Sequence, residues 1–276
     1  MNAIFIAVFY VTAIGIISAI VISVASKIMA VKIDQRAAQI QDCLPGANCG
    51  ACGYPGCSGY AAALATVKDV KCNLCTPGGA AVMAKISALL GIDAGTIERQ
   101  FAVVHCRGDN SARQKKMNYY GIQSCEAAKQ LFGGEGACAF GCLGYGDCQK
   151  VCPSTAICVE NGLARINTLF CTGCGLCAKT CPNNLISVKA AGGLAVSVLC
   201  KNIEKGALVR KECANGCIGC GKCVRECPAG AITLEENLAR IDYSKCVPYR
   251  SQAENGCARC AAVCVTRCIY SPTGQW

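Results

Sequence analysis

The stretch Cys171-Thr-Gly-Cys174-Gly-Leu-Cys177-Ala-Lys-Thr-Cys181-Pro182 decides how the second half of this 276-residue chain folds. Its first three cysteines stand two residues apart, so their thiolates can surround one compact metal–sulfur cube, and the glycines let backbone N–H groups approach the sulfurs. Pro182 fixes the next turn and directs the fourth thiolate towards a neighbouring site. A tetrahedral zinc ion prefers two CxxC pairs far apart in the sequence. The run therefore favours a [4Fe–4S] cluster over zinc.

Four segments of the chain repeat this pattern. The second and third have the spacing of bacterial ferredoxins, in which the fourth cysteine of a run ligates the other cluster of a pair. The first run is looser, and the fourth has a loop after Cys246 and Val265 in place of the proline. The runs are Cys138-x3-Cys142-x5-Cys148-x3-Cys152-Pro, Cys171-x2-Cys174-x2-Cys177-x3-Cys181-Pro, Cys217-x2-Cys220-x2-Cys223-x3-Cys227-Pro and Cys246-x10-Cys257-x2-Cys260-x3-Cys264.

Crossed ligation between the first and second runs, and between the third and fourth, predicts four clusters. The predicted ligand sets are Cys138, Cys142, Cys148 and Cys181; Cys152, Cys171, Cys174 and Cys177; Cys217, Cys220, Cys223 and Cys264; and Cys227, Cys246, Cys257 and Cys260. The inserted loop and the missing proline leave the ligation of the last cluster open.

Alternating stretches between the runs, at residues 160–167 and 236–242, predict β-hairpins. One module is therefore used twice, and we predict an α+β fold. Helices are expected at 59–70, 79–90 and 123–132, and a strand at 98–105. The predicted domains are a membrane anchor (1–34), a small helical 4Fe-4S domain (35–95), a connector (96–132) and two tandem two-cluster ferredoxin modules (133–195 and 196–276).

The helical domain has a different Cys pattern. Cys49, Cys52 and Cys57 are close in sequence, and a remote fourth ligand would complete one more cubane. We favour Cys75, because the Thr-Pro-Gly-Gly turn after it would expose its sulfur; Cys72 is the alternative. A structural zinc site is the competing interpretation for this unit.

Residues 2–26 contain no charged side chain and predict a helix long enough to cross a bilayer. A cleaved signal peptide would need a basic segment before a shorter apolar stretch, and neither is present. Lys27, Lys32 and Arg36 follow the segment, which predicts a single-pass protein of the cytoplasmic (inner) membrane with its bulk on the cytoplasmic side. That reducing compartment favours metal ligation by cysteine over disulfides.

Composition narrows the function further. The chain has 28 cysteines, one histidine (His105) and a net charge of +10. Four thiolates around a 2+ iron–sulfur core leave about −2 per cluster, so five [4Fe–4S] clusters would add about −10 and offset the basic excess. The excess therefore does not indicate nucleic-acid binding, and we expect none. No dinucleotide or phosphate-binding loop and no nucleophile–base pair is found, so we expect an electron relay without a nucleotide site of its own.

Eight cysteines remain outside the predicted sets, and we expect most of them to be packed apolar side chains. For Cys106 and Cys125, which flank the connector, a further metal site is the alternative. His105 is expected to be packed or capping, although its neighbour Cys106 leaves ligation open. The remaining cysteines are Cys43, Cys72, Cys106, Cys125, Cys158, Cys200, Cys213 and Cys268.

Together, the apolar segment, the stretch from Leu44 to Cys57, Cys75-Thr-Pro-Gly-Gly and the tandem modules resemble the B subunits of Rnf electron-transport complexes. The resemblance covers essentially the whole chain, and its N-terminal Cys run is the specific part. It implies an oxidoreductase that moves electrons between reduced ferredoxin and NAD while translocating Na⁺ or H⁺. The B subunit would accept electrons from soluble ferredoxin and pass them to flavin and iron–sulfur subunits, in contact with other membrane subunits and lipid.

Two other functions compete with this one. A membrane-anchored polyferredoxin could serve another respiratory or hydrogenase complex, although the N-terminal Cys unit argues against it. A metal-thiolate storage protein or structural zinc protein would have no need of ordered Cys-Pro endings separated by hairpins.

Overall fold

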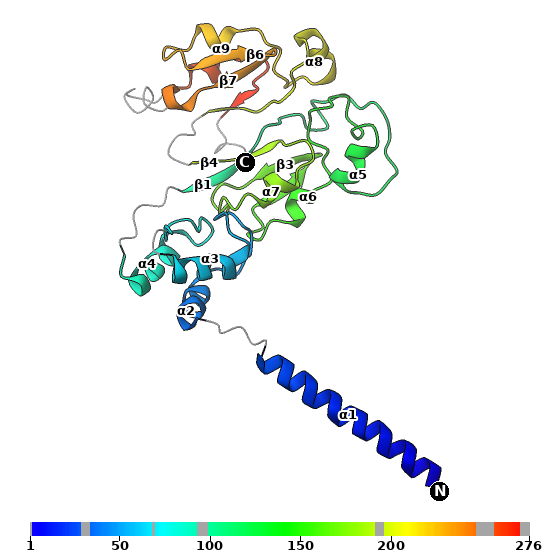
Figure 1. Ribbon diagram of the computed structural model, residues 1–276. Helices are drawn as coiled ribbons and strands as arrows, with labels where there is room; N and C mark the ends of the chain where they lie inside the picture. The colour runs from blue at the N-terminus through cyan, green and yellow to red at the C-terminus, as the bar shows by residue number, and fades with distance from the viewer. Residues whose placement is uncertain are drawn as a thin grey trace.

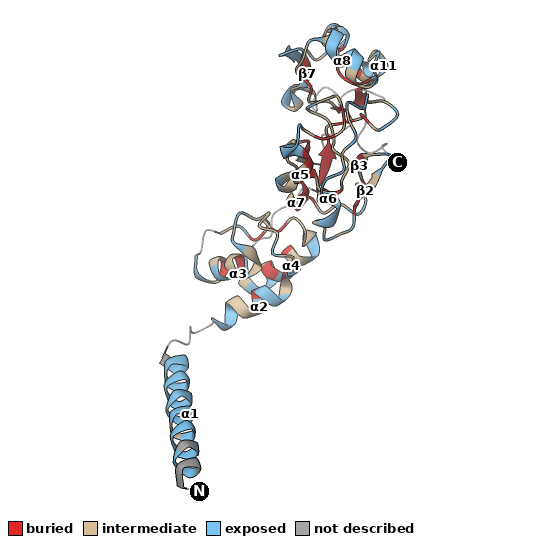
Figure 2. Ribbon diagram, turned by 90° about the vertical axis from the view of Figure 1, so that its right-hand side faces the viewer, coloured by how far each residue is buried: buried red, intermediate tan, exposed pale blue. Residues whose placement is uncertain are grey.

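A computed structural model describes residues 2–28, 34–67, 70–92, 99–190, 196–246 and 257–270. The chain begins with α1 (Asn2–Ile28), which projects away from the rest of the molecule (Figure 1) and is coloured as exposed over most of its length (Figure 2). Within it, Val8–Lys27 is long and apolar enough to cross a membrane. Apolar side chains facing outwards on every side of a helix are what a lipid environment requires.

The next unit is a small helical domain built from α2 (Gln35–Cys43), α3 (Gly56–Thr66) and α4 (Gly79–Leu90). Ile40, Tyr60 and Ile86 form its buried core, and the Tyr60 hydroxyl donates to the carbonyl of Lys71 at 2.7 Å. The helix predicted at 59–70 begins earlier and ends at Thr66, and its last predicted turn falls partly outside the described residues. The sequence analysis did not predict α2, which the Asp34 carboxylate caps by accepting from the N–H of Arg36.

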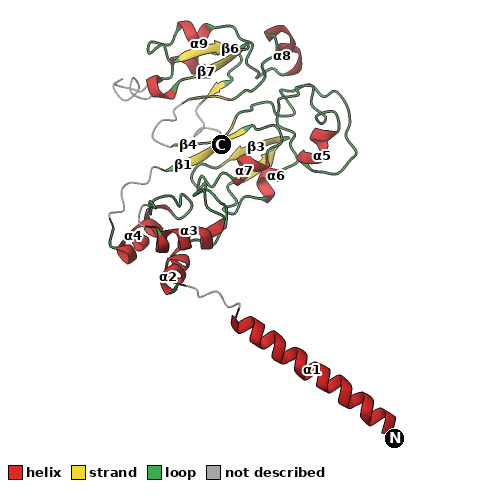
Figure 3. Ribbon diagram, in the orientation of Figure 1, coloured by secondary structure: helices red, strands yellow, loops and turns green. Residues whose placement is uncertain are grey.

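The first ferredoxin-like module contains two antiparallel pairs of strands (Figure 3). Strands β2 (Ile157–Glu160) and β3 (Leu163–Ile166) form the predicted hairpin, and β1 (Gln100–Val104) pairs with β4 (Ile186–Ala190). Two short helices, α6 (Asp147–Lys150) and α7 (Leu176–Thr180), lie within the Cys runs. Short elements between Cys-rich loops leave the interior to be filled by cysteine sulfurs and a few aliphatic side chains.

The second module repeats this architecture. Its hairpin is β6 (Ile232–Glu235) with β7 (Leu238–Ile241), and its second pair is β5 (Ser197–Val198) with β8 (Ile269–Tyr270). Short helices α9 (Lys222–Arg225) and α11 (Arg259–Ala262) lie within its Cys runs, and α8 (Gly206–Glu212) precedes them. The fold class predicted from the sequence is confirmed. The domain boundaries stay predictions.

The predicted connector, residues 96–132, is part of the folded body. It supplies β1, as expected for a strand near 98–105, and α5 (Cys125–Gln130) within the helix predicted at 123–132. Between them, residues 112–116 run alongside both modules. Ala214 N–H donates to the Ala112 carbonyl and Gln114 N–H to Glu212, each at 2.8 Å. On the other side, Lys116 N–H donates to Glu135 and Ala137 N–H to Gln114, again at 2.8 Å.

Candidate iron–sulfur centres

The least regular Cys run forms a complete set in the structure. A cavity of about 350 Å³ lies beside Pro228 and the hairpin residues Ile232 and Ile241. Burial, followed by the negative charge of neighbouring thiolates, raises the pKa of Cys260 in this cavity to about 12. The loop after Cys246 therefore does not separate the predicted ligands. The lining cysteines are Cys227, Cys246, Cys257 and Cys260.

A second cavity, of about 380 Å³, lies in the first module. Its lining cysteines are Cys125, Cys142, Cys148 and Cys181. Three of these belong to a predicted set, but the fourth predicted member, Cys138, does not line this cavity. Gly141 N–H donates to the Cys138 carbonyl at 3.3 Å in the turn between Cys138 and Cys142, and Cys138 lines a different cavity from Cys142. Burial and then the charges of Cys142 and Cys125 raise the pKa of Cys148 to about 12.

Comparison of the two modules explains why a remote cysteine is needed here. Tyr145 stands between Gly144 and Gly146, both with positive φ, in the same way that Cys220 stands between Gly219 and Gly221. The first module thus has a tyrosine where the second has a cysteine, and Cys125 completes the set in its place. The sequence analysis left Cys125 outside. Aligning 138–153 with 213–228 without gaps would have exposed the missing ligand.

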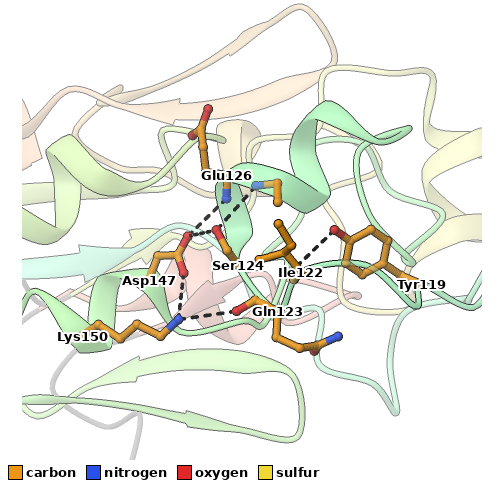
Figure 4. Close-up of polar contacts among 8 residues, drawn as sticks. Tyr119, Ile122, Gln123, Ser124, Glu126, Asp147 and Lys150 are labelled. Carbon is orange, nitrogen blue, oxygen red and sulfur yellow. Dashed lines mark hydrogen bonds and ion pairs between the residues drawn. The ribbon is translucent and has the colours of Figure 1, made fainter.

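Asp147 contacts both neighbours of Cys125 in the chain, Ser124 and Glu126 (Figure 4). Its carboxylate accepts from the Ser124 hydroxyl at 2.9 Å and from the backbone N–H of Glu126 at 3.1 Å, so it anchors the first turn of α5. Lys150 Nζ lies 3.4 Å from the same carboxylate. Burial alone would raise the pKa of Asp147, but these hydrogen bonds outweigh it and hold the pKa below its ordinary value.

A third cavity, of about 450 Å³, lies between the two modules. It is lined by four cysteines that belong to no other cavity described here, together with Arg107, Arg113 and Lys201. The cysteines are Cys106, Cys138, Cys200 and Cys213. Only Cys138 was predicted as a ligand, and in a different set.

In two further predicted sets, the cysteines lie close enough for the charge of one member to raise the pKa of another member of the same set. Burial first, and then the charges of Cys171, Cys174 and Cys152, raise the pKa of Cys177 to about 12. The backbone N–H of Ala102 in β1 also donates to Cys171 Sγ at 3.3 Å. In the second module, burial and the charges of Cys217, Cys220 and Cys264 raise the pKa of Cys223. The structure therefore brings the members of both sets together.

Cys268 lies against this last set, where Leu185 and Ala231 lie in the other runs. Its Sγ is 3.5 Å from Cys264 Sγ. Hydrogen bonds from Cys268 lower the pKa of Cys217 to about 6 and that of Cys264 to about 5. Cys268 itself is buried, and its single S–H can donate to one neighbouring thiolate at a time, which stabilises that thiolate. Cys220 in the same set is exposed, alone among the 28 cysteines, all of which the structure describes.

The helical domain brings Cys75 to the three cysteines of its run. Burial is the main reason that the pKa of Cys75 is raised, and the charges of Cys57, Cys49 and Cys52 raise it further. This arrangement favours Cys75 over Cys72 as the fourth ligand. Cys72 is buried in the same core.

The donor chemistry fits iron–sulfur clusters at these sites. Amide groups donate to the sulfurs, as Leu185 N–H does to Cys181 at 3.4 Å and Ala231 N–H to Cys227 at 3.3 Å, and such bonds tune bound clusters. Burial raises the pKa of several grouped thiols, such as Cys148, Cys177 and Cys260, so a bound cation has to stabilise their thiolates.

His105 is packed, as the sequence analysis expected. Nδ1 lies 2.9 Å from the carbonyl of Val198 and must donate to it, so Nε2 accepts from the Ser187 hydroxyl at 2.7 Å. Burial lowers its pKa and favours this neutral form. With both ring nitrogens engaged, His105 joins β4 to β5 and has no lone pair left for a metal.

Family comparisons agree with these sites. The FeS model, which describes an Fe-S cluster, matches residues 44–77, and two models described as 4Fe-4S dicluster domains match residues 170–232 and 216–268. The chain is 43% identical to the B subunit of the proton-translocating ferredoxin:NAD(+) oxidoreductase complex of Clostridium ljungdahlii, over 99% of this chain and 92% of the relative. The chain belongs to the family of Rnf B subunits. Both dicluster matches begin after the irregular first run, which is where Tyr145 replaces a cysteine.

Other relatives in this family of Rnf B subunits cover the chain nearly as fully. The B subunit of the Na(+)-translocating ferredoxin:NAD(+) oxidoreductase complex of Acetobacterium woodii is 37% identical over 98% of this chain and 78% of the relative. The B subunit of the ion-translocating oxidoreductase complex of Methanosarcina acetivorans is 35% identical over 92% of this chain and 93% of the relative. Membership of the family accounts for the membrane-type helix, the helical Fe-S domain and the tandem modules together. The alternative function, a polyferredoxin that serves another complex, is not favoured.

Proposed function

We propose that this chain is the membrane-anchored electron-transfer subunit of an Rnf-type ion-translocating oxidoreductase. It would accept electrons from reduced ferredoxin and relay them towards flavin and iron–sulfur partner subunits and NAD. The observation that carries the proposal is the series of four-cysteine sets in the helical domain and in both modules. Bound [4Fe–4S] clusters supply one-electron transfer, with potentials set by cluster environment.

Five ligand sets follow from the cavities and the electrostatic groupings. Four are those expected from the sequence, and in the fifth Cys125 replaces Cys138. The proposed sets are Cys49, Cys52, Cys57 and Cys75; Cys152, Cys171, Cys174 and Cys177; Cys125, Cys142, Cys148 and Cys181; Cys217, Cys220, Cys223 and Cys264; and Cys227, Cys246, Cys257 and Cys260.

Contacts between sets support an ordered path. Burial raises the pKa of Cys174, and the charge of Cys49 in the helical domain is close enough to raise it further. Cys177 likewise contributes to the raised pKa of Cys148, after the larger effect of burial, which links the two sets of the first module. The helical domain therefore borders the first module at Cys174, and electrons can pass between them over a short distance.

The membrane arrangement is also a proposal. We infer a single pass through the cytoplasmic membrane by α1, in contact with lipid, and a cytoplasmic location for everything after it. Lys27, Lys32 and Arg36 support this orientation, because basic residues are retained on the cytoplasmic side. Soluble ferredoxin, the proposed electron donor, is then on the same side as the clusters.

Anaerobic reduction of the purified full-length protein tests the function. Reduced ferredoxin should bleach the visible iron–sulfur absorbance of the protein, and the EPR spectrum should show several reduced [4Fe–4S] signals. Partner subunits of the complex should co-purify with it. A colourless protein that contains zinc and no iron would contradict the proposal. A hydrogenase in place of the flavin subunits would identify another complex.

A further inference from the structure

We propose that Cys106, Cys138, Cys200 and Cys213 hold a sixth [4Fe–4S] cluster at the junction of the two modules. The proposal rests on the proposed iron–sulfur function of the chain and adds a site to it. The four cysteines line one cavity. Cys106 and Cys213 are buried, and Cys138 and Cys200 are partly buried.

The internal repeat produces this site in two halves, one from each module. Cys138-Ala-Phe-Gly-Cys142 and Cys213-Ala-Asn-Gly-Cys217 have the same pattern, and in both the glycine N–H donates to the carbonyl of the first cysteine at 3.3 Å. Cys138 and Cys213 are therefore equivalent.

The other two cysteines are equivalent by strand register. Val104 of β1 pairs with Ile186, and Val198 of β5 pairs with Ile269. Cys106 and Cys200 each lie two residues beyond those valines. Each module thus contributes one cysteine after its first strand and one that lies four residues before Cys142 or Cys217, and the site is complete only when the modules meet.

Backbone pairing between the modules brings the halves together. Residues 112–116 lie between 135–137 of the first module and 212–214 of the second, so the segments that carry Cys138 and Cys213 flank one strand-like stretch. Gly108 faces two of the sulfurs. A side chain there would place Cβ 3.2 Å from Cys213 Sγ and 3.7 Å from Cys106 Sγ, so glycine leaves the space free.

Hydrogen-bond donors surround the four sulfurs, as they do at the other sets. Cys106 Sγ accepts from the N–H groups of Gly108 and Cys142, each at 3.4 Å. Cys138 Sγ accepts from Nδ2 of the fully buried Asn202 at 3.5 Å. Such donors stabilise thiolates, as they do around bound iron–sulfur clusters. Arg107, Arg113 and Lys201 line the same cavity and would offset the negative charge of a bound cluster.

The position of the site gives it a role. The N–H of Cys142, a proposed ligand in the first module, donates to Cys106 Sγ, and the N–H of Cys217, a proposed ligand in the second, donates to Cys200 Sγ at 3.3 Å. One amide thus separates the junction site from a cluster on either side. A cluster here would complete the path between modules.

The iron content of the unaltered full-length protein tests the site without any substitution. Anaerobically purified protein should contain about 24 iron atoms and as many acid-labile sulfides, four for each of six clusters, whereas five clusters would give about 20. Mössbauer spectra should show only [4Fe–4S] iron. About 20 iron atoms, or zinc at the junction site, would overturn the sixth cluster and leave the proposed electron-transfer function intact.

A pair of variants locates the extra iron. Cys138→Ser with Cys213→Ser should lower the content by about four iron atoms per chain and remove one EPR-active centre. Cys158→Ser is the matched control, because Cys158 lies on β2 outside the three cavities; it should keep every iron atom. An unchanged iron content in the double variant would overturn the proposal.

A milder change separates loss of a cluster from loss of the fold. Asn202→Leu keeps the cysteines and removes a donor to Cys138 Sγ, so all the iron should remain while one reduction potential becomes more negative. If every potential stays unchanged in a redox titration, Asn202 does not face a cluster and the site is not the one proposed.

Discussion

Tyr145 occupies in the first module the position that Cys220 occupies in the second. Both residues lie between glycines with positive φ, in loops that lead into α6 and α9 respectively. The fourth ligand of the set that contains Cys142, Cys148 and Cys181 must therefore come from elsewhere. The cavity supplies Cys125 at the start of α5.

This relationship predicts a rescue. Cys125→Ser should remove one cluster, about four iron atoms, from the anaerobic protein. Adding Tyr145→Cys to that variant should restore the iron, because it recreates the regular run of the second module. Iron and sulfide analysis checks both steps. Recovery should fail if a cysteine is introduced at Tyr119 instead, which contacts the Tyr145 ring but lies outside the run.

Asp147 should matter for the stability of the same cluster. Asp147→Ala removes the acceptor for Ser124 and for the Glu126 N–H, and the loss of such an anchor costs about 1–2 kcal/mol. Release of about four iron atoms to a chelator should become faster, since α5 no longer holds Cys125 firmly. Lys150→Ala is the control, because Lys150 is exposed and its 3.4 Å ion pair with Asp147 contributes little. Equal release rates in the two variants would contradict this role.

The helical domain allows a direct choice between two cysteines. Cys75→Ser should remove its cluster, because Cys75 faces the three cysteines of the run. Cys72→Ser should keep the iron and lower the free energy of unfolding by about 1 kcal/mol, as expected for a changed buried side chain. EPR and metal analysis of the two variants give the answer. The reverse pattern would make Cys72 the ligand.

Cys268 should tune a cluster without binding it. Its Sγ lies 3.5 Å from Cys264 Sγ, and Ala231 stands at the corresponding place in the third run. Cys268→Ala should therefore keep the iron content and make one reduction potential more negative, because a thiol donor beside the cluster's ligands is lost. Potentiometric EPR measures this shift. Loss of about four iron atoms would instead identify Cys268 as a ligand.

The sequence was sufficient wherever one short segment carries the whole pattern. The Leu-Ala-Arg-Ile strands at 163–166 and 238–241 pair in equivalent hairpins, and the Cys-Pro endings predict sets whose members lie together in the structure. Positive φ at Asn161 and Gly162, and at Glu236 and Asn237, gives both turns the same shape.

Sequence spacing was insufficient where ligands come from distant segments. Cys125 is at the start of α5, and its partners come only after that helix has ended. The Asp147 carboxylate anchors this helix start, and no sequence motif predicts that contact. Cys106 and Cys200 become neighbours only through pairing of the modules along residues 112–116. Spacing along the chain groups Cys138 with the nearest run, whereas in the structure Cys138 lines the cavity between the modules.

The exposure of Cys220 affects both the oxygen sensitivity of the protein and its electron exchange with partners. Solvent, and therefore dissolved oxygen, reaches that corner of the second module while the other thiols are at least partly covered. We expect brief contact with air to damage this centre before the rest. We expect a redox partner to exchange electrons most readily with this exposed centre.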